Sequence, residues 1–227
     1  MSASLRIVSV VAARDEAERV AMTVEAIRSL PDIDEVVVVD DGSGDGTAEL
    51  ARSAGARVLV SRRSVGKGRA LDRALDTVDA DVFLLLDADL GASAKEASTL
   101  LQLVVSGGAD LAIGVLPRQE GHGGFRLVKR ASAAWIRWLS GFRAAEPMSG
   151  QRALTRRVVD VVRPLAGGFG VELGMTVDAV RAGLRVVEVP VAVEHAPTGR
   201  DLRGFVHRAR QGVDHLRAAL PRALRLR

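Results

Sequence analysis

The sequence predicts an α/β fold, with one domain built on a mostly parallel central sheet and helices on both faces. Short apolar runs alternate with segments of helical periodicity through the first half of the chain. These runs are apolar along their whole length, which is typical of parallel strands covered on both faces. The 227 residues are enough for one large domain, and no internal repeat or low-complexity linker divides them.

The first half shows the clearest alternation of strands and helices. Strands are expected at residues 5–11, 35–40, 57–60 and 82–86, because these runs are short and strongly apolar. Helices are expected at residues 16–30, 47–54, 66–78 and 94–106, where apolar residues return at three- and four-residue steps. A fifth strand is expected at residues 111–115, where this half ends.

The second half, residues 116–198, follows a different pattern. Residues 116–125 are polar and contain three glycines, which is typical of a loop. We expect a helix at residues 127–139, a short strand at 150–154, a helix at 172–182 and a last strand at 184–194. Pro190 lies within the last strand and indicates an edge strand or a bulge, since proline donates no ladder hydrogen bond.

Residues 199–227 are interpreted as a basic amphipathic C-terminal helix. Apolar residues recur at helical steps between Leu202 and Leu220, Asp201 is a suitable N-cap, and Pro221 is expected to end the helix. The segment holds eight arginines and two aspartates, whereas the whole chain has a net charge of +4. Because the remainder is slightly acidic, we expect no nucleic acid as a partner. The helix either docks on its own domain or makes peripheral contact with an anionic membrane.

Several classes of protein are excluded by features that the sequence lacks. It has no cysteine, which rules out disulfides, thiolate catalysis and thiolate metal sites. Its apolar runs are far shorter than the roughly 20 residues of a membrane span, and no signal-peptide pattern opens it. The turn after the first strand has no glycine, so the dinucleotide-binding fingerprint is absent. We therefore expect a cytoplasmic enzyme, in which any contact with a membrane would be made by residues 199–227.

Acidic residues stand at the ends of two predicted strands. Asp40 and Asp41 end the second strand, and Asp87 and Asp89 follow the fourth. In an open parallel sheet such strand ends meet at one edge, where ligands bind. Two carboxylates one residue apart can hold a divalent cation, Mg²⁺ or Mn²⁺, which commonly bridges a diphosphate. The alternative is a solvated acidic turn, because an isolated Asp-x-Asp is a weak signal.

Four segments of the first half resemble family 2 glycosyltransferases of the GT-A fold in order and spacing: VSVVAARDE, VVVVDDGSGDGT, VGKGRALDRAL and LLLDADL. In the second half, GVLPRQEGHGG and EPMSGQRALTR resemble dolichol-phosphate-mannose-synthase-like members, and GFGVELG with a later histidine resembles the glucosyl-phosphoglycerate synthases. The resemblance implies a single GT-A-like domain over residues 1–227. Residues 1–115 would bind the nucleotide sugar and residues 116–198 would form the acceptor side.

The resemblance also implies roles for residues around the donor. Ala13 and Glu16 would line the base pocket, while Asp40 and Asp41 would contact the base and ribose. Lys67 lies in a glycine-lysine-glycine turn that opens a predicted helix, and it would sit near the nucleotide. A helix N-terminus favours anions independently of the resemblance.

The metal site implied by the resemblance centres on the Asp87-Ala88-Asp89 segment. Asp87 and Asp89 would bind the cation, with Asp89 as the more direct ligand and Ala88 as part of the donor site. His195 would be a third ligand, since imidazole suits Mn²⁺. The alternative for His195 is a side chain that caps the end of the last strand.

The acceptor side has weaker candidates. Glu172 is a candidate general base toward an acceptor hydroxyl, or else a carboxylate at a helix N-terminus. The residues expected to shape the sugar pocket are Gly150, Gln151 and Arg152. Lys129 and Arg130 suit a phosphate on the acceptor, and their alternative is a solvated helix face.

The hypothesis is a metal-dependent glycosyltransferase that uses a nucleotide-diphosphate sugar and an unidentified acceptor. The acceptor would be a polyprenyl phosphate, a phosphoglycerate-like small molecule or a glycan hydroxyl. One alternative is a nucleotidyltransferase that makes a nucleotide sugar. Another is a non-catalytic nucleotide-sugar-binding module recruited to membranes by its tail. The sequence leaves a homodimer open.

Overall fold

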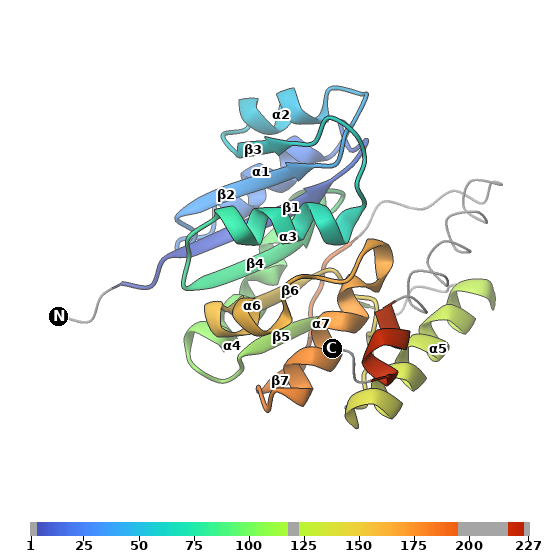
Figure 1. The fold of residues 1–227 in the computed structure, drawn as a ribbon. Coiled ribbons are helices and arrows are strands. Elements are labelled where there is room, and N and C mark those ends of the chain that lie inside the picture. Colours follow the sequence, from blue (N-terminus) through green and yellow to red (C-terminus); the bar gives the residue numbers. More distant parts are fainter. Residues whose placement is uncertain (1–3, 118–122, 195–217, 225–227) are drawn as a thin grey trace.

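The computed structural model describes residues 4–117, 123–194 and 218–224. Seven strands form one sheet in the order β3-β2-β1-β4-β6-β5-β7 (Figure 1). Their bounds are β1 Ile7–Ala13, β2 Glu35–Asp40, β3 Arg57–Val60, β4 Val82–Asp87, β5 Leu111–Val115, β6 Arg152–Thr155 and β7 Val186–Pro190. Neighbouring strands are parallel except where β6 pairs with β4 and β5. The predicted α/β fold with a mostly parallel sheet is therefore confirmed.

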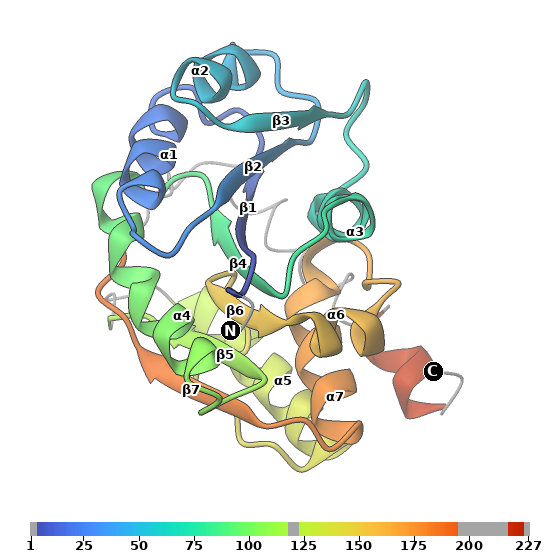
Figure 2. The same cartoon turned by 90° about the vertical axis from the view of Figure 1, so that its left-hand side faces the viewer.

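Helices cover both faces of this sheet, as Figure 2 shows. The helices are α1 Val20–Arg28, α2 Thr47–Ser53, α3 Lys67–Thr77, α4 Ser98–Val105, α5 Gly123–Ser140, α6 Arg156–Val162 and α7 Val171–Arg181, with 3-10 segments at Gly91–Ala97 (η1) and Gly168–Gly170 (η2). Successive strand residues point to opposite faces. Accordingly, Leu84 lies in the core beneath α1 and α4, and Phe83 lies in the core beneath α3, α6 and α7.

The first half follows the predicted pattern with local differences. The predicted helix 16–30 begins only at Val20, because the backbone N–H of Glu16 donates to Thr47 at the start of α2 and that of Ala17 donates to Asp45 just before α2. The predicted helix 94–106 starts as the 3-10 segment η1 and becomes α-helical at Ser98. Both differences concern the turns at which the strands end, where side-chain hydrogen bonds compete with helix formation.

The second half departs further from the predicted pattern. Helix α5 begins at Gly123, so the last part of the predicted loop 116–125 is helical, and residues 118–122 lie outside the described residues. Helix α6 was not predicted; it begins directly after β6, where the Thr155 hydroxyl accepts from the Val158 N–H. The predicted strand 184–194 is shorter, and β7 is an edge strand, as Pro190 indicated.

The C-terminal segment at residues 218–223 is helical and includes Pro221, so the expectation that Pro221 ends the helix is wrong. A proline inside a helix loses the hydrogen bond that its own N–H would donate, and its ring crowds the carbonyl four residues earlier. Packing on the domain offsets this cost here. Ala218 and Ala219 share a core with α5 and α7, and the buried Arg222 pairs with Asp178 of α7. This part of the tail therefore docks on its own domain, while residues 199–217 and 225–227 lie outside the described residues.

No helix in the described ranges is both long enough and apolar enough to cross a lipid bilayer.

Candidate functional site

The candidate site lies at the carboxyl edge of the parallel strands. Ala13 is paired with Asp40 across β1 and β2, and Ala12 is paired with Asp87 across β1 and β4. Three strand ends therefore reach the same level of the sheet, as the parallel arrangement predicts. Ala13 and Asp40 are buried, and Asp87 is partly exposed at the edge.

The turn after β1 and the loop after β2 are joined by side-chain hydrogen bonds. The Asp15 carboxylate accepts from the Gly44 N–H at 3.0 Å, and the Glu16 N–H donates to the Thr47 hydroxyl at 2.9 Å. The Asp40 carboxylate accepts from the N–H of Ser43 at 2.9 Å. These bonds hold Glu16 and Asp40 on one wall of the edge, where the sequence predicted the nucleotide base and ribose.

Asp41 anchors the turn that leads into α3. Its carboxylate accepts from the Ser64 hydroxyl and the Val65 N–H, both at 2.7 Å, and from the Gly66 N–H at 2.9 Å. The next residue is Lys67, the first residue of α3. Asp41 therefore positions Lys67, and its expected contact with the donor stays a prediction.

Lys67 connects the two halves of the chain. Its ammonium lies 2.7 Å from Asp87 Oδ1 and 2.8 Å from Glu172 Oε1, and Glu172 lies in the first turn of α7. Burial alone would lower the pKa of Lys67, but the two carboxylates outweigh it and raise that pKa above its ordinary value. Gly68, the second residue of α3, lets α3 lie close to the segment that precedes α7. A Cβ at this position would lie 2.0 Å from the Ala166 carbonyl oxygen. The ammonium therefore stays charged between Asp87 and Glu172.

The Gly150-Gln151 segment closes the other side of Asp87. The Gln151 amide Nε2 donates to Asp87 Oδ2 at 3.1 Å. A Cβ at Gly150 would lie 2.5 Å from Asp87 Oδ2 and 2.6 Å from Lys67 Nζ, so a larger residue would displace both side chains. The structure thus brings together five predicted residues, which are Lys67, Asp87, Gly150, Gln151 and Glu172.

Arg152 is buried beneath this network. Its guanidinium donates from Nε to the Ser149 carbonyl oxygen at 2.9 Å and from Nη1 to the Thr176 hydroxyl at 3.1 Å. Burial lowers the pKa of Arg152 to about 10, against the opposing effect of the Glu172 and Glu188 carboxylates. Arg152 therefore supports the site from within the core, and its expected contact with the sugar stays a prediction.

Negative charge is concentrated where the cation was predicted. Partial burial, followed by the charges of Asp89, Asp87 and Asp45, raises the pKa of Glu16 to about 7. Such crowded carboxylates are stabilised by a divalent cation, so these residues fit Mg²⁺ or Mn²⁺. Ala88 lies buried between the two metal candidates.

Three-residue metal clusters of His, Cys, Asp or Glu do not occur among the described residues. The proposed third ligand, His195, lies outside the described residues. Mg²⁺ in proteins is commonly held by one or two carboxylates together with substrate phosphates. A donor diphosphate could therefore complete the coordination that Asp87 and Asp89 begin.

The two basic residues proposed for the acceptor phosphate are in different environments. Lys129 lies 2.5 Å from a carboxylate oxygen of the buried Glu146. The N–H groups of Ala145 and Glu146 in turn donate to the Glu188 carboxylate of β7, each at 2.7 Å. Arg130 is exposed on α5. Lys129 thus ties α5 to the segment before β6, and contact of either residue with a phosphate stays a prediction.

The sequence reasoning missed Asp45 as part of this edge. Its carboxylate accepts from the Thr47 hydroxyl and from the N–H groups of Thr47 and Ala17, and the Thr47 hydroxyl is the main cause that lowers its pKa. The signal was present, because an aspartate before a glycine commonly accepts a hydrogen bond from the backbone N–H two residues on, as in an Asx turn.

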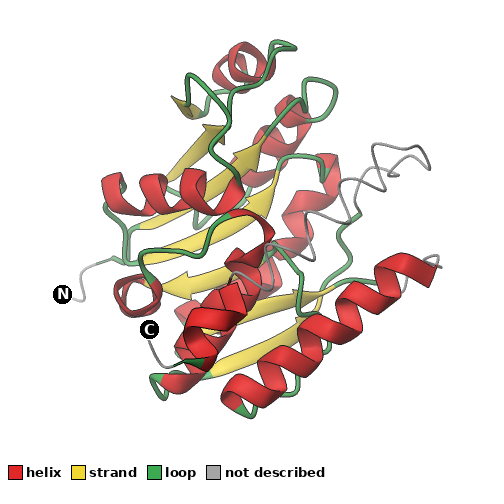
Figure 3. Cartoon of the chain, turned by 45° about the vertical axis from the view of Figure 1, so that its right-hand side comes forward, coloured by secondary structure: helices red, strands yellow, loops and turns green. Residues whose placement is uncertain are grey.

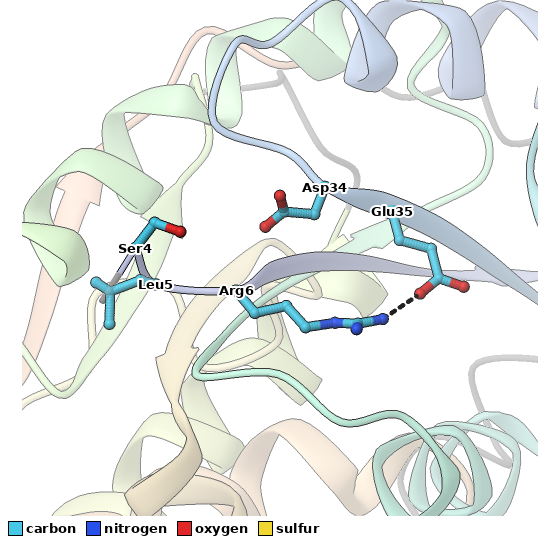
Figure 4. Close-up of a pocket in the computed structure, with 5 residues that line it drawn as sticks. All are labelled: Ser4, Leu5, Arg6, Asp34 and Glu35. Carbon is cyan, nitrogen blue, oxygen red and sulfur yellow. Dashed lines mark hydrogen bonds and ion pairs between the residues drawn. The ribbon is translucent and has the colours of Figure 1, made fainter. Parts of the chain in front are cut away.

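A hollow lies at the opposite edge of the sheet, away from the candidate site. It is lined by Ser4, Leu5, Arg6, Asp34 and Glu35, as Figure 4 shows. Arg6 and Glu35 pair there at 2.9 Å. These residues stand at the amino ends of β1 and β2, where parallel sheets do not usually bind ligands. The hollow is therefore separate from the candidate site.

Comparison with known proteins gives one family for most of the chain. The model described as Glycosyl transferase family 2 matches residues 9–158. Glycosyltransferase AglJ of Haloferax volcanii is 33% identical over 196 residues, which cover 82% of this chain and 62% of AglJ. Glucosyl-3-phosphoglycerate synthase of Mycolicibacterium smegmatis is 34% identical over 233 residues, covering 92% of this chain and 76% of that protein. The chain thus spans less than two thirds of AglJ.

Two further similarities concern possible acceptors and ligands. Undecaprenyl-phosphate mannosyltransferase of Micrococcus luteus is 28% identical, covering 82% of this chain and 83% of that protein. A crystal structure of glucosyl-3-phosphoglycerate synthase from Mycobacterium tuberculosis, in complex with Mn²⁺, uridine diphosphate and phosphoglyceric acid, has a TM-score of 0.79 and 28% identity. That similarity covers 95% of this chain and 79% of the other. Because that structure is a Mn²⁺ complex, the similarity supports a divalent cation as cofactor.

Proposed function

The chain belongs to glycosyl transferase family 2, and we propose that it transfers a sugar from a nucleotide-diphosphate sugar to an acceptor with the help of a divalent cation. The observation that carries this proposal is the bridge from Asp87 through Lys67 to Glu172. It joins the Asp-x-Asp segment of the nucleotide-binding half to the acceptor half at the edge where ligands of parallel sheets bind.

The donor would be held along the carboxyl edge. Asp89 is the proposed direct ligand of the cation, and Asp87 is kept in place by Lys67 and Gln151. When bound, the cation supplies positive charge to the diphosphate as the sugar leaves. Ala13, Glu16 and Asp40 form the proposed base and ribose wall.

The acceptor class that we propose carries a phosphate. Support comes from two relatives, one named for 3-phosphoglycerate and the other for undecaprenyl phosphate. If the attacking group is the phosphate itself, it is already anionic and needs no strong base. If it is a hydroxyl, Glu172 is the proposed general base, because it is the acceptor-side carboxylate in contact with Lys67.

A turnover assay tests the proposal. The protein is incubated with uridine and guanosine diphosphate sugars, Mn²⁺ and either 3-phosphoglycerate or a polyprenyl phosphate, and sugar transfer is measured. We expect transfer with one pair of substrates and loss of turnover by about a thousandfold in Asp89→Ala, since a catalytic cation contributes several kcal/mol. Retained transfer in Asp89→Ala would contradict the metal assignment.

The role of Glu172 has its own test. Glu172→Gln keeps the shape of the side chain but removes the base, so a hydroxyl acceptor should react about 10²–10⁴ times more slowly. A phosphate acceptor should react at nearly the original rate. Unchanged rates with a hydroxyl acceptor would remove Glu172 from the chemistry.

Location and assembly remain predictions from the sequence. The absence of cysteine fits a cytoplasmic enzyme, and the basic segment 199–217 is the part of the tail proposed to touch a membrane. Cell fractionation tests the location. The molecular mass in solution tests the homodimer.

A further inference from the structure

Helix α5 exposes one side to solvent that is both apolar and cationic. Figure 3 shows α5 at the periphery of the domain. The exposed residues, called the α5 face below, are Leu127, Arg130, Ala131, Ala134, Arg137 and Trp138. Leu127 is 71% exposed and Trp138 is 67% exposed, the two highest values among the exposed large apolar side chains of the described residues.

The sequence spacing places these residues on a single stripe. Residues 127, 131, 134 and 138 repeat at four- and three-residue steps, and Arg130 and Arg137 lie along one side of that stripe. The opposite side of α5 packs inward through Ile136 and Leu139. The helix Gly123–Ser140 contains no aspartate or glutamate. Nothing on α5 itself therefore balances the two arginines.

The arginines of this region also lack partners elsewhere in the described residues. Arg130, Arg137 and the nearby Arg143 make no hydrogen bond or ion pair with any of them, whereas Lys129, on another side of α5, pairs with Glu146. Arg137, Trp138 and Arg143 line a shallow hollow together with alanines 133, 134 and 144. Arg137 and Arg143 have no partner among the described residues, and two such guanidinium groups beside an indole suit an anionic group attached to an apolar body.

We propose that the α5 face docks on the surface of an anionic lipid bilayer. A helix with an apolar stripe, flanking arginines and an exposed tryptophan is the arrangement that lies in the plane of a membrane interface. Trp138 and Leu127 enter the boundary between head groups and acyl chains, and Arg130, Arg137 and Arg143 bind the lipid phosphates. From Leu127 to Trp138 the α5 face runs for about 17 Å along the helix axis.

The position of α5 relative to the candidate site follows from the sheet. Strand β6 is antiparallel to both β4 and β5, so β5 ends at the same edge as Asp87. Helix α5 is the next described element after β5 and therefore begins from that edge. A docked α5 places the site next to the lipid surface. The docking itself does not rest on the proposed transferase activity.

Tryptophan fluorescence tests whether the α5 face docks on a membrane. Its two tryptophans are Trp135 and Trp138, it has no tyrosine, and the two indole rings lie 5.5 Å apart. In Trp135→Phe, tryptophan emission therefore reports on the α5 face alone. We expect the emission to shift to shorter wavelength with vesicles of equal parts phosphatidylglycerol and phosphatidylcholine, and not with phosphatidylcholine alone. No shift with the anionic vesicles would overturn the proposal.

The arginines are tested by vesicle sedimentation of the full chain. Arg130→Gln/Arg137→Gln should weaken binding about thirtyfold, because each arginine near an anionic surface contributes about 1 kcal/mol. The matched control is Arg73→Gln/Arg157→Gln, which removes two exposed arginines from α3 and α6 and should change binding less than twofold. Equal weakening in both variants would mean that only net charge matters and would contradict a specific face.

A second copy of the chain is the competing occupant of the α5 face. In that case the emission of Trp135→Phe would shift with protein concentration in the absence of lipid, and the mass in solution would be that of a dimer. That result would overturn the membrane proposal. Binding that disappears as salt is raised, with a monomeric mass throughout, would support it.

Discussion

Two lysine ion pairs, one at the carboxyl edge of the sheet and one on the acceptor side, are built in different ways. Lys67 has a side chain 20% exposed and lies between Asp87 and Glu172, so two carboxylates share one ammonium. Lys129 is 34% exposed and pairs with Glu146. Near the first pair, partial burial and then the charges of Asp89, Asp87 and Asp45 raise the pKa of Glu16. The comparison teaches that Lys67 is held by an excess of carboxylate charge, whereas Lys129 forms a single pair that joins two segments.

The largest expected effect comes from removing Lys67. Lys67→Met leaves Asp87 and the buried Glu172 without their shared cation, so the free energy of unfolding should fall by about 3 kcal/mol. Urea unfolding measures this loss. The double variant Lys67→Met/Glu172→Gln should recover part of it, because one uncompensated charge is removed. If the double variant is no more stable than Lys67→Met, the ammonium of Lys67 does not compensate the charge of Glu172.

Replacing Gly150 should damage the site while leaving the fold intact. In Gly150→Ala the atoms nearest to the new Cβ are the ends of the Asp87 and Lys67 side chains, which can move. Turnover should fall about a hundredfold from the displaced carboxylate, and the unfolding free energy should change by less than about 1 kcal/mol. Gly167→Ala is the matched control, since its Cβ would contact nothing within 4 Å and its φ is −71°. Equal turnover in the two variants would contradict this geometry.

Lys129 should show the smaller effect expected of a balanced pair. Lys129→Met should lower the unfolding free energy by about 1 kcal/mol, because the lysine is one third exposed and Glu146 can still be partly hydrated. The KM for the acceptor should change little. A rise in that KM of tenfold or more, with stability unchanged, would instead assign Lys129 to the acceptor phosphate.

An effect as small as that of Lys129→Met concerns pH at the carboxyl edge. The folded chain raises the pKa of Glu16 from 4.5 to about 7, so it binds that proton more tightly than the unfolded chain does. Stability should therefore decrease as pH rises from about 4.5 to about 7, by about 1 kcal/mol after allowance for solvent screening. Chemical unfolding at pH 5 and pH 8 measures this, with Glu16→Gln as the control that lacks the decrease. Mn²⁺ should remove the decrease in the wild type.

The site was predictable from the sequence where its residues are local to strand ends. Asp40 and Asp87 end β2 and β4, and the register places both beside the end of β1. Lys67 was recognisable from its glycine turn, but not its contact with Glu172, because that contact needs α3 and α7 to pack together. Arg152 shows the limit most clearly, since a charged residue in a short strand gives no sign that it will be buried.

The sequence alone determined the order of strands and helices in the first half, the acidic edge of the parallel sheet and the absence of cysteine chemistry. Hydrophobic periodicity and strand-end residues act over a few neighbours, so they can be recognised without the tertiary structure. Tertiary structure decided which charges meet. The antiparallel β6 brings Gly150 and Gln151 beside Asp87, and the packing of α7 brings Glu172 to Lys67. It also left one side of α5 uncovered. Such contacts depend on how distant segments pack, and no local pattern encodes them.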